Sequence, residues 1–174
     1  MRDKLVGEIP YLRRFARGLA RDRSRADDLV QECVERALTR EHLYDPSRNL
    51  RTWLFTILRN LYLNKIRDER ARPVVSEAKF DDLLVAPPGG SQFDVVLARQ
   101  VLTAMEALSV EHREVLLLVA VEGLSYRETA EIIGTPTGTV MSRLARALSS
   151  CGSRSRVDHG AKSGESNERS RRNR

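Results

Sequence analysis

The chain has 174 residues, of which 41% are hydrophobic and 31% are charged, and 30 Lys and Arg against 24 Asp and Glu leave a net charge of +6. This length excludes a large catalytic architecture and allows one or two small domains, and the hydrophobic fraction excludes a wholly disordered chain. No apolar run reaches the ~20 residues of a membrane span, and the charged N-terminal segment lacks a secretory apolar core, so we expect a cytoplasmic protein without membrane insertion.

Helices are predicted throughout the first 70 residues. The first helix has arginines on one side and apolar residues at helical spacing on the other, namely Ile9, Leu12, Phe15, Ala16 and Leu19. The second begins at about residue 26, and its apolar positions are Ala26, Leu29, Val30, Val34, Ala37 and Leu38. Its other side is acidic. We expect Asp27 and Asp28 in its first turn, where the positive end of the helix dipole favours carboxylates.

A turn over residues 44–49 precedes the third helix, because Pro46 and Asn49 interrupt helical structure. The third helix runs from about Leu50 to Arg70. Its inward positions are Trp53, Leu54, Ile57, Leu58 and Leu61, and its outward positions are Arg51, Arg59, Asn60, Asn64, Lys65 and Arg67.

Residues 71–92 are rich in proline and glycine and are predicted to be a flexible linker. Fully extended, this segment spans about 70 Å, so the two halves need not touch. Helical periodicity returns at 93–108. After residue 150 the chain has little to bury, and we expect residues 151–174 to form a disordered basic tail.

The segment 93–150 has the pattern of a helix-turn-helix. A short helix ends at Gly123, and Ser125 with Glu128 forms a capping-box signature that opens the next helix. Gly134 makes a turn, after which Thr135 and Pro136 match an N-cap followed by proline at the first helical position. The predicted fold is therefore all-α, with two small helical domains (1–70 and 93–150) joined by the flexible linker.

The last helix carries hydroxyl groups that suit phosphate oxygens, at Thr137, Thr139 and Ser142. It also carries two arginines that suit guanine edges or phosphates, Arg143 and Arg146. Residues 1–70 carry a net charge of +5, whereas 93–150 carry −2. A DNA-binding domain with so little positive charge should bind weakly by itself, because counterion release from cationic contacts supplies much of the affinity.

Two surfaces of the first domain allow alternative interpretations. The third helix mixes Trp53, Phe55 and Tyr62 with basic residues, which suits stacking on unpaired bases, although Trp53 also fits a core position and the arginines a solvated face. The acidic side of the second helix is either a docking surface or solvent-facing charge. The cysteines and histidines show no ligand spacing, and no nucleophile–base set or phosphate loop is present, so we expect no enzyme, no metal and no cofactor.

Two motifs carry a resemblance to a known family. The segments 27–32 (DDLVQE) and 50–60 (LRTWLFTILRN) resemble conserved region 2 of bacterial sigma-70 factors. The segment 122–134 (EGLSYRETAEIIG), with Pro136, 138–140 and 142–144 after it, resembles region 4. Both regions stand in the right order, with no third domain between them, over about residues 5–150. This layout is similar to the extracytoplasmic-function (ECF) subfamily of sigma factors.

The resemblance implies a factor that binds core RNA polymerase and directs it to specific promoters, in a stress response under the control of an anti-sigma factor. The residues implied in core polymerase binding are Asp28, Gln31, Glu32 and Glu35. Those implied in binding the opened −10 strand, with the loop at 44–50, are Asn49, Arg51, Trp53, Arg59, Asn60 and Lys65. Those implied in reading the −35 element are Thr137, Thr139, Ser142, Arg143 and Arg146. At position 141, where many members of the family have Lys or Arg, this chain has methionine (Met141).

Two other classes of protein remain open at this point. A conventional helix-turn-helix repressor or activator binds DNA by itself, usually as a symmetric dimer, and does not need the region 2 pattern. An interaction protein that sequesters partners would use the acidic and apolar faces and show no DNA preference. Transcription with core polymerase in vitro separates the three classes.

Overall fold

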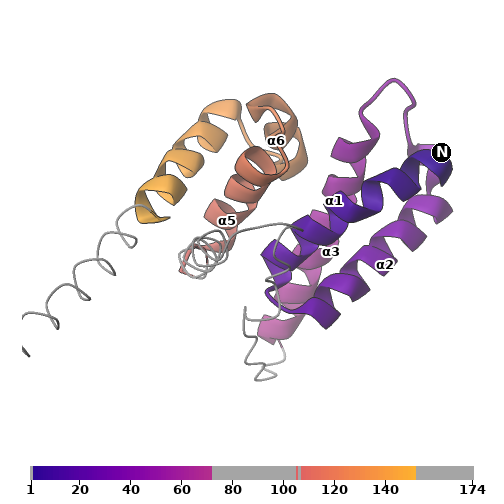
Figure 1. Ribbon diagram of the computed structural model, residues 1–174, viewed down its shortest axis with the longest axis horizontal. Coiled ribbons are helices and arrows are strands. Elements are labelled where there is room, and N and C mark those ends of the chain that lie inside the picture. The colour runs from indigo at the N-terminus through magenta and orange to yellow at the C-terminus, as the bar shows by residue number, and fades with distance from the viewer. Residues whose placement is uncertain (1, 72–104, 106, 152–174) are drawn as a thin grey trace, which may run out of the picture.

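The computed structural model describes residues 2–71, 105 and 107–151. The predicted linker, almost all of the predicted helix at 93–108 and nearly the whole predicted tail lie outside the described residues. Within the described part every regular element is helical and no strand occurs, which confirms the predicted all-α class. Figure 1 shows the N-terminal helices and the C-terminal helices as two neighbouring groups.

The N-terminal half consists of α1 (Arg2–Ala20), α2 (Arg23–Thr39), the short 3₁₀ turn η1 (Glu41–Leu43) and α3 (Leu50–Ala71). The three long helices pack on one another because each buries one apolar side. Phe15 of α1 meets Phe55 of α3 edge to face, with ring centroids 5.0 Å apart, and both side chains are fully buried. The hydroxyl of Tyr62 donates to the carbonyl of Leu19, which ties α3 to the end of α1.

Helix α2 begins earlier than the sequence pattern predicts. Arg21 adopts a left-handed backbone conformation (φ 59°), and Asp22 then caps the helix by accepting a hydrogen bond of 2.7 Å from the backbone N–H of Arg25. Asp27 and Asp28 therefore lie beyond the first turn, and the expected placement at the positive end of the dipole is wrong. The capping carboxylate at position 22 fills that role.

The predicted inward faces are buried in large part. Every predicted inward residue of α1 except the half-buried Ile9 is fully buried. In α2, Leu38 is exposed instead of inward, and Cys33 takes a fully buried position, with its Sγ 3.5 Å from the carbonyl oxygen of Leu54. Burial raises the pKa of the Cys33 thiol to about 12, so this cysteine is a packed, unreactive side chain.

The C-terminal half consists of α5 (Val110–Leu116), the π-helical segment η3 (Leu117–Val121), α6 (Tyr126–Ile133) and a final helix over residues 137–151. Gly123 and Gly134 both have left-handed backbone conformations, with φ of 69° and 66°, as the predicted turns require. The capping box is confirmed: Ser125 and Glu128 exchange side-chain and backbone hydrogen bonds at the start of α6.

The final helix starts later than predicted. Its first helical residue is at position 137, and the carbonyl of Pro136 accepts the backbone N–H groups of Thr139 and Val140. The hydroxyl of Thr135 is buried and has no hydrogen-bond partner among the described residues, so Thr135 does not act as the predicted N-cap. The turn at Gly134 nevertheless joins α6 to the final helix as a helix-turn-helix.

The two halves are packed against each other. Helix α3 contacts α6, and α1 contacts both α5 and η3. Gly18 of α1 lies close to the C-terminal half, because a Cβ atom added there would lie only 2.6 Å from a methyl group of Leu117. Buried apolar residues of both halves consequently belong to one continuous core.

Candidate functional site

The acidic side of α2 is available at the surface. Asp28, Gln31 and Glu35 are exposed, and the side-chain amide of Gln31 donates a 2.9 Å hydrogen bond to Glu35. Glu32 is only partly exposed and lies between two cations, at 3.0 Å from Arg36 and 3.2 Å from Lys65. Three of the four residues predicted to bind the polymerase therefore face solvent, and the fourth links α2 to α3.

Asn49 and Arg51 are fixed at the start of α3. The side-chain oxygen of Asn49 accepts the backbone N–H of Arg51 at 2.9 Å, which caps the helix, and its amide nitrogen donates to Glu128 of α6 at 3.2 Å. The Arg51 guanidinium lies 3.7 Å from the ring centre of Tyr11 and 2.6 Å from Glu8. The hydrogen bond with Glu8 raises the pKa of Arg51. The contacts with Tyr11 and Glu8 hold this cation against α1.

A row of side chains one helical turn apart follows along α3. Trp53 is half-buried, with its ring centre 5.1 Å from that of Tyr44, and Asn60 is exposed. Asn49, Trp53 and Thr56 line a groove of about 440 Å³. Asn60 continues the same helical face by its spacing. The structure thus brings the amide and aromatic members of the predicted −10 set together on one face.

The basic members of the predicted −10 set lie outside the lining of this groove. Arg59 is nearly buried and forms a two-pronged ion pair with Glu114 of α5, with donor–acceptor distances of 2.8 and 3.2 Å. Lys65 faces Glu32. Each of the cations Arg51, Arg59 and Lys65 therefore has a carboxylate partner.

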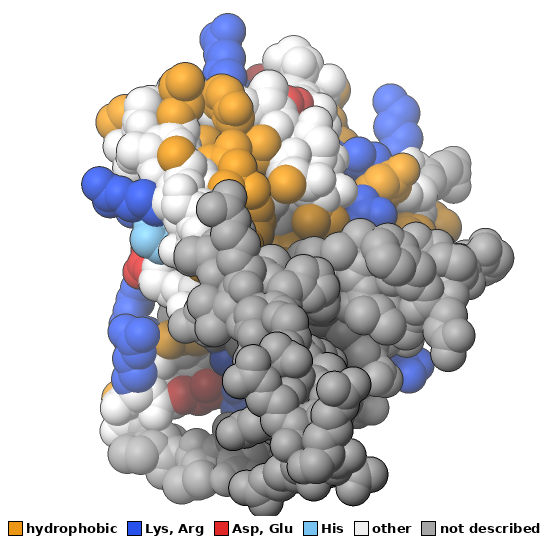
Figure 2. Space-filling view, turned by 60° about the vertical axis from the view of Figure 1, so that its left-hand side comes forward, with side chains coloured by type: hydrophobic (Ala, Val, Ile, Leu, Met, Phe, Trp, Pro, Cys, Tyr) orange, Lys and Arg blue, Asp and Glu red, His pale blue; other side chains and the backbone are white. Residues whose placement is uncertain are grey.

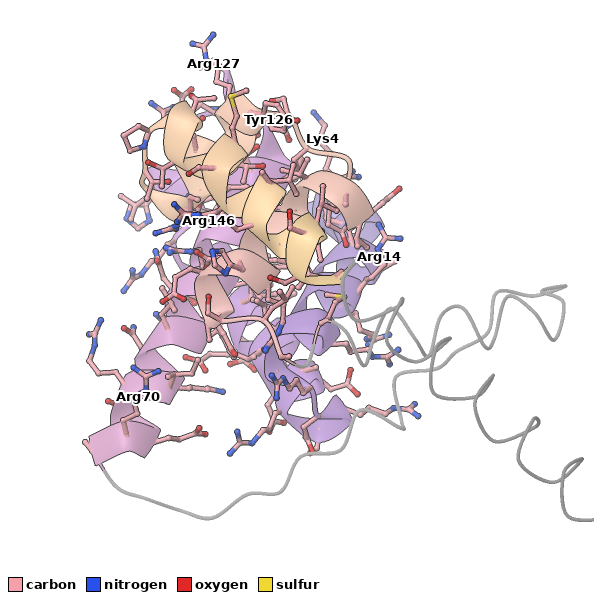
Figure 3. All side chains as sticks on the ribbon, turned by 90° about the vertical axis from the view of Figure 1, so that its left-hand side faces the viewer. Lys4, Arg14, Arg70, Tyr126, Arg127 and Arg146 are labelled. Carbon is pink, nitrogen blue, oxygen red and sulfur yellow. The ribbon has the colours of Figure 1, made fainter. Side chains whose placement is uncertain are left out.

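The predicted −35 residues are divided by the packing of the final helix. Thr137, Ser142 and Arg146 are exposed, whereas Thr139 is partly covered and its carbonyl accepts the Ser142 hydroxyl at 3.0 Å. Arg143 is only 25% exposed and lies 3.9 Å from the buried Glu114. Figure 3 shows Arg146 extending from the side of the final helix, so Arg146 is the better placed arginine for an outside ligand.

The final helix also exposes apolar side chains. Met141 and Leu148 are each 52% exposed, and with the exposed Ala145 between them they form a stripe at helical spacing. Figure 2 shows hydrophobic side chains gathered on the C-terminal half, with Lys and Arg around them. A stripe of this kind favours contact with a protein over contact with phosphate.

Among the residues that join the two halves, sequence reasoning missed Arg14, Gly18, Arg48, Glu114 and Glu122. One signal was available: by helical spacing Glu114 shares a face with Val110, Leu117 and Leu118, a face that otherwise belongs to the core. Arg113 was also missed; it is buried, and its guanidinium donates to the carbonyl of Leu108 at 2.8 Å. The partners of these charges lie too far away along the chain for a local pattern to indicate them.

Within the described residues, no group of His, Cys, Asp and Glu side chains is arranged to hold a metal ion. None of the described helices has the length and hydrophobicity that crossing a bilayer requires.

Comparison with known proteins identifies both halves. Residues 5–59 match the sigma2 domain of PhyR, and residues 98–151 match sigma-70 region 4. The ECF RNA polymerase sigma factor EcfG of Rhodopseudomonas palustris is 38% identical over 152 residues, which cover 86% of this chain and 81% of that protein. The ECF sigma factor SigC of Mycobacterium tuberculosis is 36% identical over 123 residues, or 70% of this chain and 65% of SigC.

Solved structures agree with this result. The sigma factor RpoE of Bartonella quintana, solved with the anti-sigma factor NepR, has a TM-score of 0.75 and 30% identity, and the match covers 90% of this chain and 97% of RpoE. CnrH, solved with the cytosolic domain of CnrY, has a TM-score of 0.64 and 26% identity, over 90% of this chain and 87% of CnrH. The chain belongs to the ECF subfamily of RNA polymerase sigma factors. Sigma factors are transcription initiation factors and not enzymes, which confirms the expectation that the chain has no catalytic role.

Proposed function

We propose that this sigma factor binds core RNA polymerase through residues 1–70 and directs it to promoters that residues 93–150 help to select. The observation that carries the proposal is that one chain presents an exposed acidic face on α2, an amide and aromatic row on α3, and a helix-turn-helix with an exposed arginine on its second helix. A self-sufficient repressor needs only the last of these surfaces.

The acidic face of α2 is the proposed docking surface for the core enzyme. Asp28, Gln31 and Glu35 are exposed on one helix of a domain that is otherwise basic. Carboxylates repel DNA phosphates, so such a face suits a protein partner with complementary positive charge. Glu32 contributes to the same face and also fixes Lys65.

The start and middle of α3 are the proposed site for the opened −10 strand. Trp53 offers an aromatic surface for stacking, and Asn49 and Asn60 offer amides that both donate and accept hydrogen bonds. Arg51, Arg59 and Lys65 add positive charge near this row, which favours the sugar–phosphate backbone.

The final helix is the proposed −35 reader. Thr137 and Thr139 stand at its N-terminus, where hydroxyls and backbone N–H groups suit a phosphate, and Arg146 is exposed further along. Ser142 and Arg143 complete the proposed set. Because the helix-turn-helix segment is acidic overall, we propose that it engages DNA only when the attached polymerase holds it there.

An anti-sigma protein is the proposed regulator, and a stress response is the proposed setting. Both RpoE and CnrH, which this chain resembles, were solved with anti-sigma factors. The exposed stripe of Met141, Ala145 and Leu148 is a suitable apolar surface for such a partner. We place this activity in the cytoplasm, where core polymerase and promoter DNA are found.

Transcription in vitro with core polymerase and a promoter library tests the proposal. The wild-type chain should give core-dependent transcripts from a restricted set of promoters, and Asp28→Lys should weaken core binding about tenfold or more, since a reversed charge in a desolvated interface is unfavourable. Glu41→Lys is the matched control, because Glu41 is also exposed but lies outside α2. Transcripts that do not depend on the chain, or equal losses in both variants, would contradict the proposal.

A further inference from the structure

Two arginine–carboxylate pairs with buried carboxylates bridge the halves of the chain. Arg59 of α3 holds Glu114 of α5, and Arg14 of α1 holds Glu122 at 2.8 and 2.6 Å, each with two parallel hydrogen bonds. The carboxylates are almost completely buried, with side-chain exposures of 1% for Glu114 and 0% for Glu122. Each acid comes from the C-terminal half and each arginine from the N-terminal half, so both pairs exist only while the halves are together.

Gly18 provides a notch for Leu117. The three heavy atoms nearest to a Cβ placed at Gly18 all belong to the Leu117 side chain, at 2.6, 2.7 and 3.2 Å. Leucine at position 117 thus occupies the space that a side chain on α1 would need. Glycine within a helix costs about 0.5–1 kcal/mol relative to alanine, and the close approach of the other half is the structural reason for glycine here.

Helix α6 covers the start of α3 with acidic side chains. Glu131 lies 3.1 Å from Arg48, and Glu128 accepts from Asn49 at 3.2 Å. The groove beside Trp53 consequently has the proposed base-binding residues on one wall and two carboxylates on the other. A single strand that entered this groove would bring its phosphates toward Glu128 and Glu131, which is unfavourable.

We propose that this closed arrangement is a self-inhibited form of the sigma factor, in which carboxylates of the C-terminal half pair with Arg48, Asn49 and Arg59 of the N-terminal half, at and beside the proposed site for the −10 strand. The buried pairs and the Gly18 notch hold the halves together, and the acidic residues of α6 exclude the strand. Binding of single-stranded DNA then requires the halves to separate. The inference rests on the proposed role of α3 in holding the −10 strand.

Two variants of the full-length chain open the closed form by different means. Gly18→Phe places a ring where Leu117 sits, and Gly7→Phe is its control on the same helix, because a Cβ at Gly7 meets nothing within 4 Å. The double variant Glu114→Gln and Glu122→Gln keeps the side-chain volumes and removes the bridging charges. Circular dichroism establishes that each variant remains helical.

Spin labels report the separation of the halves directly. Exposed positions on either half, Ser24→Cys and Arg127→Cys, carry the labels in a Cys151→Ser background, while Cys33 stays buried. Wild type and Gly7→Phe should give one narrow distance distribution, and both opening variants should give a longer and broader one. A broad distribution in the wild type, or an unchanged one in both opening variants, would overturn the closed form.

Fluorescence anisotropy with a labelled 20-nucleotide DNA single strand of mixed sequence measures how separation of the halves changes the affinity for single-stranded DNA. If about one molecule in ten is open, opening should tighten binding about tenfold, and Gly7→Phe should bind as the wild type does. If the halves separate in the opening variants but single-stranded DNA binds no more tightly, and promoter-directed transcription with core polymerase persists, the self-inhibition is overturned and the proposed function is not. Absence of both DNA binding and transcription in every variant would overturn the proposed function and this inference together.

Discussion

At the scale of single residues, exposure separates side chains that can meet a ligand from side chains that hold the fold. Asn60 and Arg146 are exposed, whereas Arg59 and Arg143 are drawn toward the buried Glu114. From helical spacing and the resemblance to sigma factors, all four residues were predicted to contact promoter DNA.

For the N-terminal half, Asn60→Ala should reduce promoter opening more than it reduces closed-complex formation. The exposed amide of Asn60 can bond to the Watson–Crick edge of an unpaired base, an edge that base pairing occupies in duplex DNA. Permanganate footprinting measures opening, and gel-shift titration measures the closed complex. Asn64→Ala is the control, because Asn64 is also exposed on α3 but lies one turn further along. Normal opening in Asn60→Ala would contradict the assignment.

For the C-terminal half, Arg146→Ala should cost about 1–3 kcal/mol of promoter discrimination and relax preference at one −35 position, as loss of a base contact does. Thr139→Ala should instead weaken all promoters alike, because its hydroxyl stands where a phosphate contact is expected. A promoter library transcribed with each variant measures both effects. If both variants kept the wild-type −35 preferences and full activity, the final helix would not be the reader.

At the scale of elements, α6 is defined by its two ends. Ser125 and Glu128 cap its start, and Gly134 ends it in the left-handed conformation. The hydrogen bonds from the Ser125 side chain and backbone lower the pKa of Glu128 below its ordinary value of 4.5. A carboxyl group with a lowered pKa in the folded state stabilises the fold above its unfolded pKa, and this contribution is lost as the pH falls through the folded pKa.

Ser125→Ala should therefore lower the free energy of unfolding by about 1 kcal/mol at pH 7. The difference in unfolding free energy between the wild type and Ser125→Ala should become smaller as the pH falls below about 4.5. Protonated Glu128 then no longer stabilises the fold in either protein. Urea titrations across this pH range measure the gap. Ser24→Ala is the control on α2, where Asp22 and not Ser24 supplies the cap. A gap that stays constant with pH would show that Glu128 does not take part.

At the scale of the whole molecule, the ion pairs differ in depth. Arg59 and Glu114 have side-chain exposures of 15% and 1%, whereas Arg13 and Asp27, which pair within the N-terminal half, have 50% and 43%. Loss of one partner of a buried pair leaves an uncompensated charge, while loss of an exposed pair costs little because water and salt replace it.

Arg59→Met should accordingly lower the free energy of unfolding by up to about 1.4 kcal/mol, the free energy that keeps about nine molecules in ten closed, because the halves then separate and Glu114 regains water. Arg13→Met should lower it by about 0.5 kcal/mol or less. Urea titration of the full chain measures both. The remaining contact of Glu114 with Arg143, at 3.9 Å, is too long to replace the lost hydrogen bonds. Equal effects of the two substitutions would show that Glu114 is not buried in solution.

The sequence by itself determined the helical character of both halves, the acidic face of α2, the capping box at Ser125 and the glycine turn of the helix-turn-helix. Each of these depends on residues within a few positions of one another, where spacing and capping chemistry act directly. The motifs at 27–32, 50–60 and 122–134 also indicated the sigma family, which the comparisons confirm.

Only the tertiary structure decided which charges meet. Arg14 and Glu122 are 108 positions apart, and Arg59 and Glu114 are 55 apart, so no periodic pattern links them. The same packing turned Arg143 inward, left Arg146 exposed and set Leu117 against Gly18. Helix formation follows from local spacing, but the pairing of a buried acid with a distant arginine follows from how whole helices pack, which single positions in the sequence do not encode.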